Sequence, residues 1–167
     1  TLPFVIRYPR GEGVMPEWKT EMKEIKIGTG RRLRDGADVA ILSFGHPGNF
    51  AAAAIRNLKS EGITPAHYDL RFVKPIDEAL LHEALQRYPR IVTVEDGTII
   101  GGAGAAVLEF MAEHGYHNSV KILGIPDRIV EHGTLKELHK ECGYDADAIA
   151  DAVRVLLNEE VAATASV

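Results

Sequence analysis

The chain has 167 residues, of which 46% are hydrophobic and 26% charged, and its formal net charge is -5. These values are typical of one globular domain, and they exclude a disordered chain, a fibrous repeat and an overall attraction for nucleic acid. No apolar run approaches the roughly 20 residues that cross a bilayer, and the first residues show no signal-peptide pattern. A cytoplasmic protein without nucleic-acid or membrane partners is therefore expected.

The first 38 residues show no regular pattern. Residues 4–7 read as a short apolar strand with no preceding partner, as expected of a sequence cut from a longer protein. Residues 12–38 are polar and broken by glycine and proline, which is typical of a linker, with a possible edge strand at 23–27. This stretch also carries a basic cluster, interpreted as a solvated turn, of Arg31, Arg32 and Arg34.

From residue 39 onward, strand and helix patterns alternate. Strands are predicted at 39–44, 66–70, 91–95 and 120–124, and helices at 49–61, 77–87, 101–114, 134–141 and 147–159. Alternation of this kind requires crossover connections, so the predicted fold is α/β, a mainly parallel open sheet with helices on both faces. We expect 39–44, 91–95 and 120–124 to be central strands, buried on both sides.

A glycine-rich turn, Gly101-Gly102-Ala103-Gly104, opens one predicted helix, where exposed amides could cradle a phosphate. A dinucleotide fingerprint needs a third glycine, but positions 105–107 are Ala, Ala and Val, so the GxGxxG pattern fails. A tight turn that lets the helix pack closely on the sheet is the favoured interpretation.

Carboxylates and imidazoles follow two predicted strands. Glu95 and Asp96 end one strand, and Asp127 and His132 follow the next, at the edge where parallel sheets usually place ligands. They could form an acid/base pair, but Asp96 also fits an ordinary turn and Asp127 a turn cap, so structural roles are favoured. The histidines show no metal-ligand spacing and the single cysteine, Cys142, has no partner, so we predict neither a metal site nor a disulfide.

Two cations, Arg71 and Lys74, also follow a predicted strand and could meet an anion. Lys74 precedes Pro75 and should be held extended. We favour an ion pair between Arg71 and an acidic neighbour such as Asp69 or Glu95. The residues alone therefore predict an α/β domain without a complete catalytic set.

Four strings, in this order, resemble the carboxyl-terminal region of 1-deoxy-D-xylulose-5-phosphate synthases, a branch of the transketolase family. They are Arg7-Tyr8-Pro9-Arg10-Gly11, Asp69-Leu70-Arg71-Phe72-Val73-Lys74-Pro75, Gly101-Gly102-Ala103-Gly104 and Ile125-Pro126-Asp127. The resemblance implies a transketolase carboxyl-terminal domain at 38–160. It also implies the end of a pyrimidine-binding domain at 1–11, an interdomain linker at 12–37 and a frayed tail at 161–167.

Enzymes of that family condense pyruvate with D-glyceraldehyde 3-phosphate to give 1-deoxy-D-xylulose 5-phosphate and CO2, which serves isoprenoid, thiamine and pyridoxal synthesis. The resemblance implies that thiamine diphosphate and Mg2+ belong to the full-length parent and are not bound by this chain, which has no GDG motif. The chain is then an inactive, structural fragment whose partners are the missing amino-terminal domains and the second subunit of a homodimer. Arg10 matches the family arginine that binds the substrate phosphate, for which a guanidinium fork is suited.

Two alternatives remain open at this point. One is the carboxyl-terminal domain of a 2-oxoacid dehydrogenase β subunit, whose last domain has similar glycine-rich turns. The other is a self-standing domain that binds a small anion at the strand ends around Gly45, Asp96 and Gly101.

Overall fold

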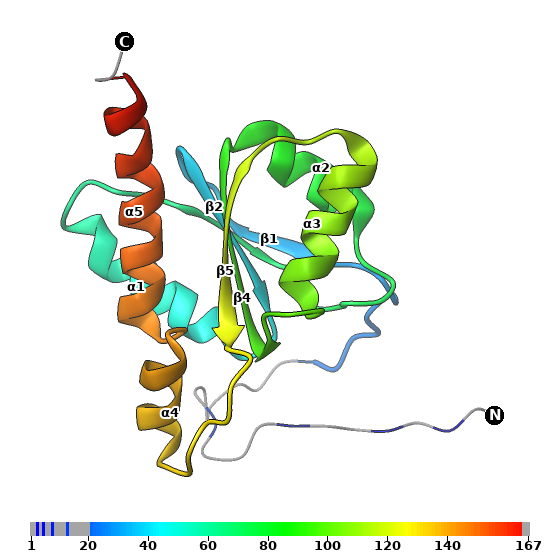
Figure 1. The fold of residues 1–167 in the computed structure, drawn as a ribbon. Helices are drawn as coiled ribbons and strands as arrows, with labels where there is room; N and C mark the ends of the chain where they lie inside the picture. The colour runs from blue at the N-terminus through cyan, green and yellow to red at the C-terminus, as the bar shows by residue number, and fades with distance from the viewer. Residues whose placement is uncertain (1–2, 4, 6–7, 9–12, 14–20, 165–167) are drawn as a thin grey trace.

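The computed structural model describes residues 3, 5, 8, 13 and 21–164, and strand and helix alternate along most of this part (Figure 1). The elements are β1 (Arg31–Arg34), β2 (Val39–Phe44), α1 (Gly48–Lys59), β3 (Ala66–Asp69), α2 (Glu78–Arg87), β4 (Arg90–Thr98), α3 (Ala103–His114), β5 (Ser119–Ile125), α4 (Leu135–Cys142) and α5 (Ala146–Thr164). The expected strands and helices from residue 39 onward are therefore confirmed, with shifts of a few residues at their ends.

The five strands form one sheet in the order β1-β3-β2-β4-β5, in which β1 is antiparallel to β3 and the other pairs are parallel. Helices α1 and α5 cover one face, and α2 and α3 cover the other (Figure 1). The predicted fold class, a mainly parallel α/β sheet with helices on both faces, is confirmed.

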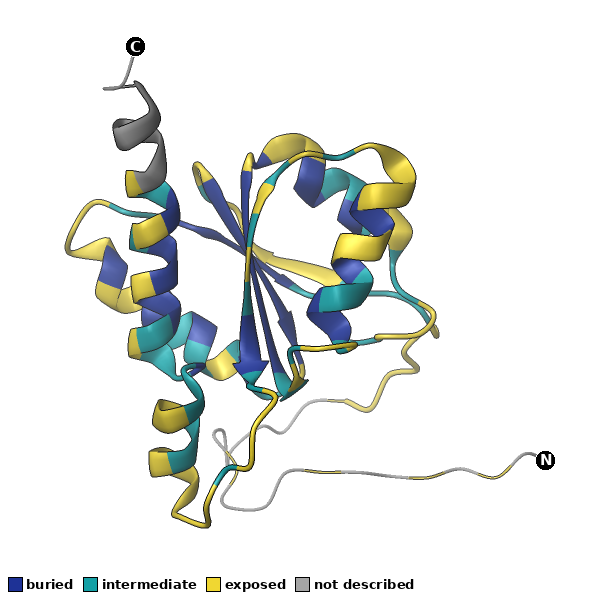
Figure 2. Ribbon diagram, in the orientation of Figure 1, coloured by how far each residue is buried: buried dark blue, intermediate teal, exposed yellow. Residues whose placement is uncertain are grey.

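Strand β2 shows how the sheet divides the interior into two cores. All six of its residues are buried (Figure 2). Because successive side chains of a strand point to opposite faces, Ile41 packs in the core under α1 and α5, whereas Leu42 packs in the core under α2 and α3. A continuous apolar run in the sequence is what such a strand requires.

The two edges of the sheet differ from the prediction. Residues 23–27, predicted as an edge strand, form no strand and are exposed; the edge is β1, formed by the arginines that were interpreted as a turn. Part of the expected linker thus belongs to the sheet, while the other domain boundaries stay predictions. β5, predicted as central, is the opposite edge: it pairs only with β4, and its residue Lys121 is exposed.

Side-chain caps fix the starts of α2 and α4. Asp77 caps α2, as expected, by accepting from the amide of Leu80 at 3.0 Å, and its other oxygen accepts from the amide of Gly30 at 2.8 Å. Thr134 and Glu137 form a capping box at α4. In contrast to the other helices with described side chains, α4 has no buried residue (Figure 2). No helix in the described ranges has the length and apolar character of a membrane span.

Candidate functional site

The strand order reverses at β2, which places a topological switch point between the carboxyl ends of β2 and β4. Open α/β sheets bind ligands in the crevice at such a point. His46 follows β2 there, and Asp96 lies near the end of β4. Groups that could bind or react are therefore expected at the carboxyl edge of the sheet.

The glycine-rich start of α3 is occupied by a carboxylate of the chain itself. Glu95, only 7% exposed, accepts from the amide of Ala103 at 2.9 Å and from that of Gly104 at 2.8 Å. A carboxylate is favourable at a helix start because it satisfies amides that lack helical partners. The position where a phosphate would bind is thus filled, and Glu95 has a structural role, as favoured from the sequence.

The glycines of this turn allow the close approach. A Cβ atom added at Gly102 would collide with the carbonyl oxygen of Thr98, and one added at Gly104 would lie 2.6 Å from a methyl group of Ile122. The interpretation as a turn for close helix–sheet packing is confirmed.

Asp96 belongs to a cluster of rings at the switch point. Its Oδ1 accepts from the hydroxyl of Tyr144 at 2.9 Å, and its Oδ2 lies 3.6 Å from Nδ1 of His46. The rings of His46 and His139 have their centroids 5.3 Å apart, and Phe50 contacts both. Burial lowers the pKa of His139, and the neighbouring His46 adds to this, while burial and the bond to Asp96 raise the pKa of Tyr144. Tyr144 is therefore a hydrogen-bond donor, not a base.

This cluster forms one wall of a cavity of about 850 Å³ under α4, which we call the α4 cavity. Its ionisable lining is mainly acidic and comprises Asp96, Glu131, Asp145 and Asp147 against Lys136, with His46, His132 and His139. Rings and carboxylates of this kind can stack on and attract a cationic or aromatic group. Cys142 also lines the cavity, but burial raises the pKa of its thiol, so it is a poor nucleophile.

The four sequence candidates at this edge do not form one catalytic set. Glu95 binds the start of α3, Asp96 binds Tyr144, and His132 lines the α4 cavity. Asp127 is exposed, and in the described part of the chain it has neither a hydrogen bond nor an ion pair, so the expected turn cap is not found; the turn is closed by the Arg128 amide, which donates to the Pro126 carbonyl oxygen. Within residues 21–164 no cluster of three or more potential metal-ligating side chains occurs.

Arg71 has an unusual backbone at the carboxyl end of β3. Its φ is +57°, in the left-handed region that a non-glycine residue adopts at a cost of about 1–3 kcal/mol. Its Nε lies 3.7 Å from Asp69, while Arg31 binds the same carboxylate oxygen at 3.0 Å. The favoured ion pair is confirmed, with Asp69 as the partner. No residue pattern around Arg71 predicts the left-handed backbone.

Sequence reasoning also missed a buried polar pair in the sheet. Ser43 on β2 is fully buried, and His67 on the neighbouring strand β3 is 3% exposed. The Oγ atom of Ser43 lies 2.9 Å from Nε2 of His67. They are far apart in the sequence, and the parallel pairing of β2 with β3 brings them together. Arg10, the predicted phosphate ligand, lies outside the described residues.

Comparison with known proteins agrees with this architecture. The family model described as "Transketolase, C-terminal domain" matches residues 28–149. The proteins named 1-deoxy-D-xylulose-5-phosphate synthase from Cytophaga hutchinsonii and Bacteroides thetaiotaomicron are 60% and 56% identical over 92% and 88% of this chain. The chain spans about a quarter of the length of these relatives, 24% and 23%.

Solved structures agree as well. A structure titled "Split gene transketolase, inactive beta4 tetramer" aligns with a TM-score of 0.76 and 32% identity over 81% of this chain and 44% of that one. A transketolase from Pichia stipitis, 18% identical with a TM-score of 0.55, covers 80% of this chain and 18% of that one and shows the fold alone.

The fold and the carboxyl edge thus define a doubly wound α/β domain. Its glycine-rich turn, the kind of turn that can bind a phosphate, is filled by its own Glu95. The chain belongs to the transketolase carboxyl-terminal domain family.

Proposed function

We propose that this chain is the carboxyl-terminal part of a thiamine-diphosphate-dependent transferase that condenses pyruvate with D-glyceraldehyde 3-phosphate to 1-deoxy-D-xylulose 5-phosphate and CO2. The observation that carries the proposal is the 43–60% identity to proteins with the synthase name over most of the chain. The same relatives favour the synthase over a 2-oxoacid dehydrogenase β subunit. The expected compartment is the cytoplasm.

The role of the chain in this enzyme is structural. Thiamine diphosphate with Mg2+ needs a phosphate cradle and oxygen ligands. In the described ranges the glycine-rich helix start is filled by Glu95, and no group of potential metal ligands occurs. The residues that the structure describes therefore do not fit the cofactor, which we expect the rest of the parent to hold. The domain would pack on those parts and contribute to a homodimer.

Arg10 is the one residue of this chain to which we assign a direct role, as a ligand of the substrate phosphate. The support is the match of Arg7-Tyr8-Pro9-Arg10-Gly11 to the family string. A planar guanidinium can donate two hydrogen bonds to one phosphate, which an ammonium cannot do in the same geometry.

The experiment is a chimaera in which this chain replaces the matching segment of the Cytophaga hutchinsonii relative. We expect the chimaera to form 1-deoxy-D-xylulose 5-phosphate and the isolated chain to bind neither cofactor nor pyruvate by calorimetry. Arg10→Ala should lower kcat/KM for the aldehyde phosphate roughly ten- to a hundredfold, since one charge-assisted contact is worth about 1.5–3 kcal/mol.

Two controls make the result specific. Arg10→Lys should recover part of the loss. Arg128→Ala, which removes an exposed arginine elsewhere in the chain, should leave kcat/KM unchanged. An inactive but folded chimaera would contradict the proposed enzyme. Unchanged kinetics for Arg10→Ala would remove only the role of Arg10.

A further inference from the structure

A second cavity, of about 380 Å³, lies between α1 and the edge formed by β1 and β3. We call it the arginine groove, because Arg31, Arg34 and Arg56 line it. Its remaining polar lining includes Asn49 of α1 and Asp69 of β3. A volume in this range is typical of sites for small molecules.

An irregularity in β1 brings the second arginine into the groove. Arg31 pairs with Asp69 and Arg32 with Tyr68, but the register then shifts, so that Arg34 pairs with His67. Residues opposite each other in a sheet share a face, and Asp69 and His67 both line the groove. In a regular strand Arg34 would share a face with Arg32. A bulge that redirects a side chain in this way is common beside functional sites.

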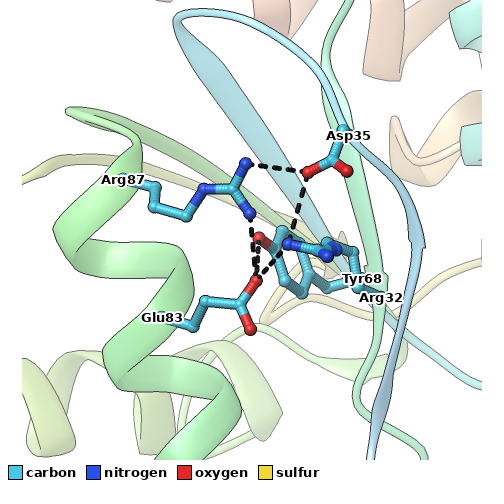
Figure 3. Close-up of polar contacts among 5 residues, drawn as sticks. All are labelled: Arg32, Asp35, Tyr68, Glu83 and Arg87. Atoms are coloured by element: carbon cyan, nitrogen blue, oxygen red, sulfur yellow. Dashed lines mark hydrogen bonds and ion pairs between the residues drawn. The ribbon is translucent and has the colours of Figure 1, made fainter.

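The arginines on the two faces of β1 differ in their ion-pair partners. On the α2 face, Arg32 binds Glu83 at 2.8 Å and Asp35 at 3.3 Å, within a network that includes Tyr68 and Arg87 (Figure 3). On the groove face, Asp69 binds Arg31, whereas Arg34 and Arg56 have no ion-pair partner among the described residues. Three arginines thus face one aspartate on a chain whose net charge is -5.

Two buried polar side chains on neighbouring strands, Ser43 and His67, line the groove. The hydroxyl of Ser43 donates to the carbonyl oxygen of Tyr68 at 3.2 Å and lies 2.9 Å from His67 Nε2. Both side chains are held in β-strands whose backbones pair with neighbours. One wall is the first two turns of α1, where Gly48 allows Ser43 close contact: a Cβ atom there would lie 2.9 Å from Oγ. The groove is therefore preorganised, which lowers the entropic cost of binding.

We propose that the arginine groove binds a small dianion of the phosphate-monoester class through the guanidinium groups of Arg34 and Arg56. The two forks supply charge-assisted donors that suit phosphate oxygens. Of the three strand-end turns weighed from the sequence, only Gly45 lines this groove; Gly101 does not, and Asp96 lies in the α4 cavity. The inference is independent of the enzyme proposed above, because neither Arg10 nor the cofactor enters it.

The test is a titration of the 167-residue chain with inorganic phosphate at about pH 7.5, where the phosphate is mainly dianionic. Amide NMR in about 0.1 M NaCl limits non-specific attraction. Saturable shifts are expected at Arg34, Asn49 and His67. The double variant Arg34→Ala, Arg56→Ala should bind at least about tenfold more weakly, because each change removes a charge-assisted contact.

A matched control removes the same charge elsewhere. Lys121 and Lys140 are exposed and line neither cavity, so Lys121→Ala with Lys140→Ala should change the dissociation constant by less than about twofold. Arg34→Lys with Arg56→Lys should restore part of the affinity lost on changing both to alanine. Arg10→Ala should bind phosphate like the unchanged chain, which separates this site from the role proposed for Arg10.

The same spectra report whether each variant folds. The side chains replaced in the groove and in the lysine control are exposed, so these variants should retain the fold. Shifts that grow linearly without saturation would overturn the proposal. So would an equal weakening in the lysine control, since that would reflect net charge alone.

Discussion

The start of α3 and the arginine groove are two places where an anion is favourable, and the chain treats them in opposite ways. At α3 the glycine-rich turn exposes amides, but the buried carboxylate of Glu95 binds two of them. In the groove, a register shift adds Arg34 to Arg31, and among the described lining residues Asp69 is the one carboxylate that can balance them. The first is filled from within, and the second retains positive charge.

The difference shows that a binding motif in the sequence does not establish that the site is free to bind a ligand. A glycine-rich turn can bind an anion only if no side chain of the protein already does so, and the occupant here comes from an adjacent strand. The groove has no motif, because its arginines come from β1 and α1, two elements that are separated in the sequence by β2. Charge that lacks a partner in the fold is the better indication of a ligand.

The largest expected effect comes from emptying the α3 start. Glu95→Ala should lower the free energy of unfolding by about 3–6 kcal/mol, since two amides each lose a charge-assisted bond worth about 1.5–3 kcal/mol. Urea denaturation measures this. Added formate should restore part of the loss in this variant only, because it can take the place of the carboxylate.

Asp96→Ala is the matched control, since it removes the next carboxylate along β4. Asp96 is more exposed than Glu95 and accepts one described hydrogen bond, from Tyr144, so a loss of about 1 kcal/mol is expected. If both variants lost the same stability, the filled helix start would have no special role.

The sequence was sufficient for most of the fold. Continuous apolar runs identified β2 and β4, and Asp77 marked the start of α2, because burial on both faces and helix capping each leave a local pattern. β1 was missed because its four residues, Arg31–Arg34, show no apolar alternation; its partners, Asp69 and Glu83, are supplied by tertiary structure. The apolar run of β5 resembles that of a central strand, and its edge position depends on strand order.

The sites were less predictable. A structural role for Glu95 and an ion pair of Arg71 with an acidic neighbour were favoured from the sequence, but the binding of Glu95 to the α3 start was not foreseen. The arginine groove was not foreseen, because a one-residue register shift decides which face Arg34 occupies, and such a shift leaves no pattern in a four-residue strand. The Ser43–His67 pair was not foreseen either, because it depends on the pairing of β2 with β3.

The floor of the groove gives the next prediction, a dependence of stability on pH. Burial lowers the pKa of His67 to about 4. In the unfolded chain the pKa should be about 6.5. Below this value the unfolded state takes up a proton that the folded state does not, so stability falls between about pH 6.5 and pH 4 and levels off below. The full loss is roughly 3 kcal/mol, since one pKa unit corresponds to about 1.4 kcal/mol.

The measurement is the free energy of unfolding at several pH values for the unchanged chain, His67→Gln and His117→Gln. The difference in the free energy of unfolding between the unchanged chain and His67→Gln should change between about pH 6.5 and pH 4, because glutamine does not titrate. His117 is exposed, and its replacement should leave the pH profile nearly parallel to that of the unchanged chain. A parallel profile for His67→Gln would mean that His67 is not held neutral in the folded state.

The smallest effect separates the two faces of β1 by stability alone. Arg32→Ala breaks its contacts with Glu83 and Asp35 (Figure 3) and should cost about 0.2–1 kcal/mol, the usual range for exposed ion pairs. Arg34→Ala should cost no measurable stability and could stabilise the chain slightly, because Arg34 shares the groove with two like charges and contributes no described ion pair.

Thermal unfolding of both variants under identical conditions, at low and high salt, is the measurement. Salt should reduce the difference between them, since it screens both the pairing of Arg32 and the repulsion at Arg34. A clear loss of stability for Arg34→Ala would show that this arginine supports the fold, and its unpaired charge would then no longer point to a ligand.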